Sequence, residues 1–211
     1  MTTFVIAHGG GDVGWSWHLV AEALQAKGHT AVAPDLPIED ESKDLTDWAK
    51  ALTDALPSTE DVVVVGHSFG GFVAPLAAAS INAKALAYVT AMLPAPGEAP
   101  GDWWDNTGYT DSGLEDKFFH DVPPDLVAEA QKRGRGMSEN SMAKPWPLDA
   151  MPNVPTHFIL CTEDRFFTQD FMRKVVKTRL PGTEPVELAA GHYASLSKPQ
   201  ELADLLANYA R

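Results

Sequence analysis

Runs of apolar residues recur along the chain at intervals that suit a parallel sheet. The clearest is Val62–Val65, four β-branched residues in succession. A strand with one face in water would alternate with polar side chains, so this run predicts a strand that is buried on both faces. Further strands are predicted, in chain order, at Phe4–His8, Thr30–Pro34, Lys84–Thr90, Thr156–Cys161 and Val186–Leu188.

Helical periodicity fills most of the intervals between these strands. In Ser42–Leu56 the apolar residues share one helical face: Leu45, Trp48, Ala49, Leu52 and Leu56. Other helices are predicted at Trp15–Lys27, after Gly71 in an alanine-rich stretch, at Gln169–Leu180 and at Gln200–Tyr209. The alternation indicates the α/β class, with a mostly parallel sheet of about six strands and helices on both faces.

One interval, from about residue 95 to residue 153, lacks this alternation. It is rich in proline and has no strand-like run, and it is too long for a simple connection. We interpret it as a short helical cap inserted into a single domain of 211 residues, with helices at Leu114–His120 and Asp125–Arg133. The tryptophans Trp103, Trp104 and Trp146 are candidate substrate-binding residues, although packing of the cap onto the core accounts for them equally well.

The charge balance narrows the classes of partner. Lys and Arg number 16 against 29 Asp and Glu, a formal net charge of −13, which disfavours nucleic acid and anionic membrane surfaces. Cys161 is the only cysteine, so no intrachain disulfide can form, and no apolar run approaches membrane-spanning length. We therefore expect a cytoplasmic protein with no nucleic-acid or membrane partner. The sequence leaves open whether it forms a homodimer.

The valine run leads without a spacer into Gly66-His67-Ser68-Phe69-Gly70-Gly71. Ser68 is therefore expected at a strand-to-helix turn. Glycines two positions on either side of it suit a strained turn, in which side chains at Gly66 and Gly70 would clash with the neighbouring strand and helix. This is the pattern of a nucleophile elbow, G-x-S-x-G. An ordinary serine in a glycine-softened turn is the simpler alternative.

A nucleophilic serine needs a base, and the base needs an acid that fixes its tautomer. Asp164 and His192 each follow a predicted strand, as Ser68 does, and working residues of open α/β sheets gather beyond the carboxyl ends of the strands. Their order along the chain, Ser, Asp and His, is that of the α/β-hydrolase fold. Glu163 is the rival acid. We prefer Asp164, because its side chain is shorter and Phe166-Phe167 would shield it.

The first loop allows a different function. Gly9, Gly11 and Gly14 satisfy G-x-G-x-x-G between a strand and a helix, and Asp35 follows about 20 residues later, as in an NAD(P)-binding oxidoreductase. Against this, Trp15 would crowd the start of the helix, and Ser68 would have no role. The alternative is an oxyanion loop at residues 8–11, whose backbone N–H groups point at a developing negative charge.

No motif suggests a metal or another cofactor, since neither H-E-x-x-H nor paired cysteines occur. The pair His120-Asp121 in the expected cap has two interpretations. It is either a structural pair at a helix end or a pair with a role over the pocket.

With these residues assembled, the sequence resembles the α/β-hydrolase superfamily over almost its whole length. His8–Trp17, Gly28-His29 and Pro34-Asp35-Leu36 are similar to the branch that contains plant methyl-ester esterases, salicylate-binding esterases and hydroxynitrile lyases. The resemblance implies that Ser68 is the nucleophile, His192 the base and Asp164 its orienting acid, and that the N–H groups of Gly10 and Phe69 form the oxyanion hole.

Two positions distinguish the chemistries of this branch. Its hydroxynitrile lyases carry lysine directly after the catalytic histidine and threonine directly after the first-strand histidine, where this chain has Tyr193 and Gly9. The resemblance therefore implies a serine hydrolase for small, apolar or aromatic carboxylic esters, with Tyr193 as a further candidate substrate contact. A hydroxynitrile lyase and a non-catalytic ligand-binding member of the fold are the alternatives. The cap looks shorter than in the plant proteins.

Overall fold

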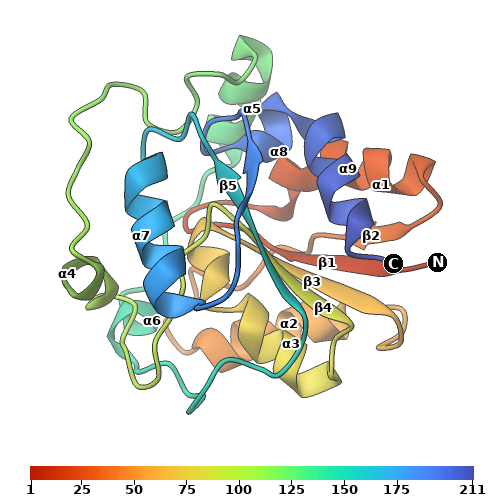
Figure 1. Cartoon of the computed structure of the whole chain (residues 1–211), viewed down its shortest axis with the longest axis horizontal. Helices are drawn as coiled ribbons and strands as arrows, with labels where there is room; N and C mark the ends of the chain where they lie inside the picture. Colours follow the sequence, from red (N-terminus) through yellow and green to blue (C-terminus); the bar gives the residue numbers. More distant parts are fainter.

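Six parallel strands form the central sheet of the computed structural model, which describes all 211 residues (Figure 1). Their order across the sheet is β2-β1-β3-β4-β5-β6. The strands are β1 Thr3–Ala7, β2 Thr30–Val32, β3 Val62–His67, β4 Ala85–Val89, β5 Thr156–Cys161 and β6 Val186–Leu188. All six agree with the strands predicted from the apolar runs, with small shifts at their ends.

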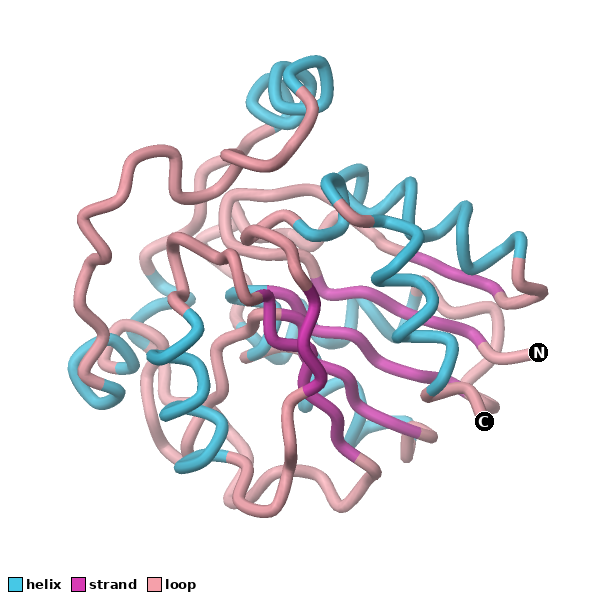
Figure 2. The backbone as a smooth tube through the Cα atoms, turned by 45° about the horizontal axis from the view of Figure 1, so that its top comes forward, coloured by secondary structure: helices cyan, strands magenta, loops and turns pink.

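Helices cover both faces of the sheet (Figures 1 and 2). Val62 and Val64 of β3 pack in one apolar cluster with helices α2 Leu45–Asp54, α3 Ala74–Ile81 and α7 Gln169–Arg179. Val63 and Val65 pack in the other cluster, with α1 His18–Ala26 and α9 Pro199–Asn208. Successive side chains of a strand point to opposite faces, so this division is why an uninterrupted valine run is stable here. Three single-turn helices, η1 Gly14–Trp17, η2 Ser68–Gly71 and α8 Ala194–Ser197, complete the covering.

Helix α2 begins at Leu45, three residues later than its periodicity predicted. The cause is Asp44, whose side chain accepts hydrogen bonds from the backbone N–H groups of Thr46 and Asp47. The Asp47 carboxylate in turn accepts from the N–H of Asp44. This reciprocal capping satisfies N–H groups that the first turn leaves free, and it sets the start of the helix.

Residues 95–153, here called the cap segment, leave the sheet between β4 and β5. They contain the helices α4 Trp103–Thr107, α5 Pro124–Arg133 and α6 Asn140–Ala143, and α5 stands apart from the sheet (Figure 2). The helix predicted at Asp125–Arg133 is confirmed, but the one predicted at Leu114–His120 is wrong, because that stretch forms turns. Asp116 has a left-handed backbone, with φ of 44°, which a right-handed helix excludes.

Candidate active site

Ser68 lies at the sharp turn between β3 and η2. Its φ is +50°, in the left-handed region that few residues other than glycine adopt. A Cβ atom on Gly66 would lie 2.8 Å from Cβ of Ala74, and one on Gly70 would overlap the carbonyl oxygen of Ala7. The two glycines are therefore required by the close approach of β1 and α3 to the turn, which is the steric reason expected from their spacing.

The structure brings Ser68, His192 and Asp164 together at the carboxyl ends of β3, β6 and β5. Nε2 of His192 lies 3.1 Å from Oγ of Ser68, and Nδ1 of His192 lies 2.8 Å from Oδ2 of Asp164. All three residues are buried, and Ser68 retains 9% of its surface. When Nδ1–H donates to Asp164, Nε2 is left as the acceptor for the serine proton, which is the tautomer that base catalysis requires.

Every oxygen of the Asp164 carboxylate has a hydrogen-bond partner. Oδ1 accepts from the backbone N–H groups of Phe166 and Phe167, at 2.8 and 3.0 Å. Oδ2 accepts from His192 and from the hydroxyl of Thr90, at 2.5 Å. Burial alone would raise the pKa of Asp164, but His192, Thr90 and the Phe167 amide hold that pKa below its usual value. The carboxylate is therefore ionised at neutral pH.

Thr90 is a site residue that the sequence reasoning missed. It follows β4 directly, is fully buried, and has a φ of +37°, which is rare for a β-branched residue. With the backbone in this conformation, the hydroxyl of Thr90 donates to Asp164, which lies 74 positions later in the chain. The only signal in the sequence was its position at the end of a predicted strand.

His67, the residue before Ser68, contacts the loop that carries His192. Its Nε2 lies 2.9 Å from the backbone oxygen of His192. Burial, reinforced by the nearby His192, lowers the pKa of His67 to about 3, so the ring is neutral and Nε2–H donates. His67 therefore holds the backbone of His192 in place.

The glycine loop after β1 passes directly over the Ser68 turn. A Cβ atom on Gly9 would lie 3.2 Å from Cβ of Ser68, and one on Gly10 would lie 3.6 Å from Cβ of Phe69. His8 holds the loop in place, because its Nδ1 donates to the carbonyl oxygen of Gly9 and its Nε2 accepts from the N–H of Leu36. Burial lowers the pKa of His8 to about 4, which keeps this arrangement neutral.

The dinucleotide-like spacing in the same loop has a local cause. A Cβ atom on Gly14 would overlap the carbonyl oxygen of Ala33, next to the end of β2. The carboxylate of Asp35 accepts a hydrogen bond from the N–H of Gly14, at 2.7 Å. The last glycine and the acidic residue of the pattern thus join the loop to β2, and an oxidoreductase function is not favoured.

Comparison with known families agrees with this geometry. The model of the alpha/beta hydrolase family matches residues 4–205. The chain belongs to the alpha/beta hydrolase family.

Named relatives of this hydrolase include plant proteins. Methylesterase 3 of Arabidopsis thaliana is 27% identical over 250 aligned positions, covering 98% of this chain and 95% of the relative. Salicylic acid-binding protein 2 of Nicotiana tabacum is also 27% identical, with coverage of 98% and 96%. The crystal structure of polyneuridine aldehyde esterase covers 100% of both chains with a TM-score of 0.85 at 23% identity, which shows the fold. Because the aligned stretches exceed 211 residues, this hydrolase is shorter than these plant relatives within the matched region.

Two of the three tryptophans in the cap segment of the hydrolase are core residues. The indole N–H of Trp103 donates to the carbonyl oxygen of Leu93, and that of Trp146 donates to the carbonyl oxygen of Phe72. Both side chains are fully enclosed in the larger apolar cluster, so they pack the cap segment onto the sheet and offer a substrate no surface. Trp104 is half-buried against other aromatic rings at the edge of that cluster.

A cavity of about 220 Å³ lies between the glycine loop and the cap segment. Gly10 and Tyr193 line it from the sheet side, and Phe118 and Phe119 line it from the cap segment. The cavity lies next to His192, because the ring of Phe118, which lines it, packs against the imidazole of His192 with centroids 5.4 Å apart. Of the predicted substrate contacts, Tyr193 is the one that lies on this cavity.

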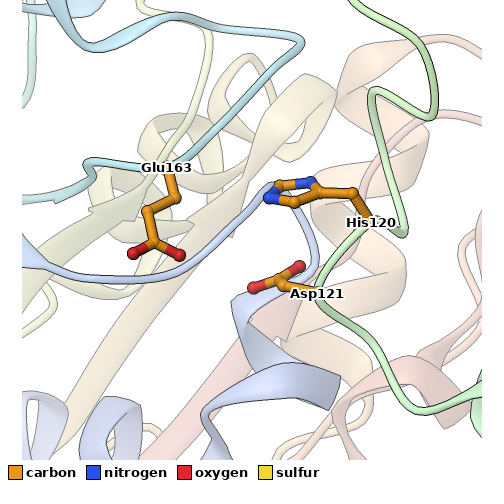
Figure 3. A group of neighbouring side chains, drawn as sticks. All are labelled: His120, Asp121 and Glu163. Carbon is orange, nitrogen blue, oxygen red and sulfur yellow. The ribbon is translucent and has the colours of Figure 1, made fainter.

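Glu163, the rival acid, has its carboxylate beside two residues of the cap segment (Figure 3). Its carboxylate lies near His120 and Asp121, and the potential metal-ligating atoms of the three residues are all within 4.8 Å of one another. Two carboxylates and an imidazole are groups that a divalent cation accepts. Asp121 has a structural contact as well, because its Oδ2 accepts a hydrogen bond from the N–H of Gly191, at 2.7 Å. The cap segment is thereby attached to the residue before His192.

Proposed function

We propose that this hydrolase cleaves small carboxylic esters through an acyl-serine intermediate. Ser68 is the nucleophile, His192 the general base and Asp164 its orienting acid. The observation that carries the proposal is the unbroken hydrogen-bonded series from Ser68 through His192 to Asp164, with distances of 3.1 and 2.8 Å. The names of relatives such as Methylesterase 3 support ester hydrolysis as the reaction.

The reaction follows from this geometry in two stages. Oγ of Ser68 attacks the ester carbonyl carbon while its proton passes to Nε2 of His192. The N–H groups of Gly10 and Phe69 stabilise the negative carbonyl oxygen of the tetrahedral intermediate. The intermediate collapses to the acyl-serine, and the departing alkoxide takes the proton from His192. Water then attacks the acyl-serine, with His192 again acting as base, and the acid is released. No step requires a cofactor.

The substrates are small apolar or aromatic esters, and residues 95–153 act as the cap over them. The cavity of about 220 Å³ is below the size typical of pockets for drug-sized ligands, and its walls include Phe118, Phe119 and Tyr193. Such a cavity suits one small ring or a short chain.

We further propose that the enzyme works in the cytoplasm. Its single cysteine, Cys161, is buried and free, so the fold does not depend on an oxidising compartment. None of its helices combines the length and hydrophobicity that a membrane-spanning segment requires.

Labelling by a fluorophosphonate, combined with turnover of a short aryl ester, tests the proposed reaction. The native enzyme should be labelled at Ser68 and should hydrolyse the ester, and Ser68→Ala should abolish both the labelling and the hydrolysis. Ser58→Ala, at an exposed serine, is the matched control and should retain both. An unlabelled native enzyme that binds NAD(H) tightly would instead support the oxidoreductase alternative.

A further inference from the structure

His120, Asp121 and Glu163 form a cluster of side chains that the proposed reaction does not use. His120 and Asp121 belong to the cap segment, and Glu163 lies in the loop that follows β5. The imidazole and the Asp121 carboxylate extend from the cap segment toward the side chain of Glu163 (Figure 3). One potential ligand atom of each residue lies within 4.8 Å of the other two. The three residues therefore converge on one point from two separate parts of the chain.

The spacing of these atoms suits a metal ion. Three atoms within 4.8 Å of one another share a point that is at most about 2.8 Å from each, the distance from the corners of an equilateral triangle to its centre. Bonds from zinc to imidazole nitrogen and to carboxylate oxygen are about 2.0–2.2 Å long, so side-chain movements of less than about 1 Å would complete them. The ion would therefore sit between the three side chains, where they already approach one another.

The two carboxylates of the cluster form no ion pair with a lysine or an arginine of the protein. Lys117 and Arg165 are the cations nearest to them along the chain, and both are engaged elsewhere. Lys117 pairs with Asp111, and the guanidinium of Arg165 donates to the backbone oxygen of Glu115, at 3.0 Å. A bound cation would therefore remove the repulsion between two neighbouring negative charges.

The surroundings of the cluster favour a ligand as well. The N–H of Gly191 donates to Oδ2 of Asp121, at 2.7 Å, which orients this carboxylate. Carboxylates that bind metals are usually oriented by such an outer hydrogen bond, and the oxygen keeps a second lone pair. His120 and Glu163 both line a surface cleft of about 540 Å³. An ion can therefore reach these two side chains from solvent.

The types of ligand atom indicate which ion fits. Imidazole suits zinc and other transition metals, whereas Mg²⁺ and Ca²⁺ are bound through oxygen ligands. One imidazole and two carboxylates therefore favour zinc, with a fourth tetrahedral position left for water. The formal net charge of −13 also attracts cations to the protein.

We propose that His120, Asp121 and Glu163 bind a zinc ion that attaches the cap segment to the loops of the catalytic acid and base. Glu163 directly precedes Asp164, and Asp121 already accepts a hydrogen bond from the residue before His192. The ion takes no part in the reaction and holds the cap segment beside the active site. The proposal does not depend on ester hydrolysis, because zinc binding and unfolding are measured without a substrate.

Isothermal titration calorimetry of the chelator-treated enzyme with zinc chloride tests the site. The native enzyme should bind one Zn²⁺ per chain at micromolar concentration, and it should bind neither Ca²⁺ nor Mg²⁺ at that concentration. Glu163→Gln removes one ligand with little change of shape and should weaken zinc binding by about 100-fold or more. Glu184→Gln, at an exposed carboxylate, is the matched control and should bind zinc as the native enzyme does. His192→Ala should also bind zinc normally, because the catalytic histidine is not a ligand.

Two further measurements test whether the ion holds the cap segment. At about a hundred-fold excess over its Kd, zinc should raise the Tm of the native enzyme by about 5–10 °C, because the complete ligand set exists only in the folded chain. Amide hydrogen exchange should become slower in residues 114–122 when zinc is added. Neither effect should occur in Glu163→Gln or in His120→Gln, which removes a second ligand.

Absence of zinc binding at micromolar concentration would overturn the inference, and so would binding that both ligand variants retain. Binding that is lost in these variants, but that leaves the exchange of residues 114–122 unchanged, would contradict the attachment of the cap segment. Normal ester turnover by an enzyme that binds no zinc would contradict this site alone. Zinc binding without turnover or labelling at Ser68 would instead contradict the proposed function and leave the site in place.

Discussion

The ring of His67 donates a hydrogen bond to the backbone oxygen of His192, 2.9 Å away, across a separation of 125 residues. The residue that precedes the proposed nucleophile therefore holds the backbone of the proposed base. The ring is neutral here, since an imidazolium would carry an uncompensated charge into a buried position. Orientation of the triad and resistance to acid thus depend on the same side chain.

This dependence predicts that the free energy of unfolding decreases as the pH is lowered from about 6.5 to about 4. Burial lowers the pKa of folded His67 to about 3 and that of His8 to about 4, whereas an unfolded histidine has a pKa near 6.5. Below pH 6.5 the unfolded chain binds more protons, so the free energy of unfolding drops by up to about 1.4 kcal/mol per pH unit for each histidine. Urea unfolding at a series of pH values measures the slope.

The variant His67→Gln should flatten that slope, because its amide can still donate to His192 but does not titrate. His18→Gln, at a partly exposed ring, is the control and should retain the native slope. If His67→Gln shows the native slope, His67 is not a source of the acid sensitivity.

The assignment of the acid predicts that Asp164→Asn lowers kcat on the order of 10⁴-fold, because the histidine loses the partner that sets its tautomer. Glu163→Gln should have little effect on kcat, since its carboxylate faces His120 and Asp121 instead. Steady-state kinetics on a short aryl ester, with circular dichroism to check the fold, decides between them. Reversed effects would mean that the acid has been misassigned.

Thr90 is expected to act through Asp164. Thr90→Val keeps the shape but removes the hydroxyl donor, so the pKa of Asp164 should rise and kcat/KM should fall on the order of ten-fold. The acid limb of the pH profile should move upward at the same time. Thr90→Ser retains a hydroxyl and should recover most of the activity. A loss in both variants without any change in the pH profile would indicate a purely structural role.

Trp103 is expected to matter for stability and not for substrate selection. Its side chain is fully buried, so Trp103→Ala should lower the free energy of unfolding by about 3–5 kcal/mol. Any change in KM should be the same for acetate esters and for bulkier esters, because Trp103 touches neither. Urea unfolding and kinetics with both esters measure the two effects. A selective rise in KM for bulky esters would place Trp103 at the substrate after all.

The enzyme should not accelerate the decomposition of mandelonitrile above its background rate. Cyanohydrin cleavage requires a cation to stabilise departing cyanide and a donor for the substrate oxygen, and neither Tyr193 nor Gly9 supplies these. A colorimetric cyanide assay of the native enzyme and of Ser68→Ala should give the same rate for both. Release of cyanide by the native enzyme that Ser68→Ala abolishes would contradict this interpretation of the two positions.

The sequence predicted all six strands, and it predicted that Ser68, Asp164 and His192 follow strands, because these features depend on local patterns. A strand buried on both faces is continuously apolar, and Ser68 follows such a strand, β3. Asp164 and His192 follow the ends of β5 and β6, so the parallel sheet brings all three residues to one edge. The turns at Leu114–His120 were not predictable in the same way, since Asp116 adopts its left-handed backbone inside an otherwise helix-compatible stretch.

The sequence also did not reveal residues whose role depends on a partner that is far away along the chain. Nothing near Thr90 in the sequence indicates Asp164, because the contact forms only when β4 and β5 pair. A tryptophan that packs and a tryptophan that binds substrate have the same local signature, which is why Trp103 and Trp146 could not be assigned before their burial was known.

The junction between Asp121 and Gly191 has a consequence for engineering chimaeras. A side chain at position 191 would displace Asp121 and His120, because a Cβ atom there would overlap Oδ1 of Asp121, and the Gly191 N–H donates to Oδ2 of the same residue. A donor cap grafted from another hydrolase must therefore bring a short acceptor to position 121. Otherwise the Gly191 N–H loses its acceptor and the backbone next to His192 is no longer held in place. A cap exchange that is meant to alter selectivity would then alter the position of His192 as well.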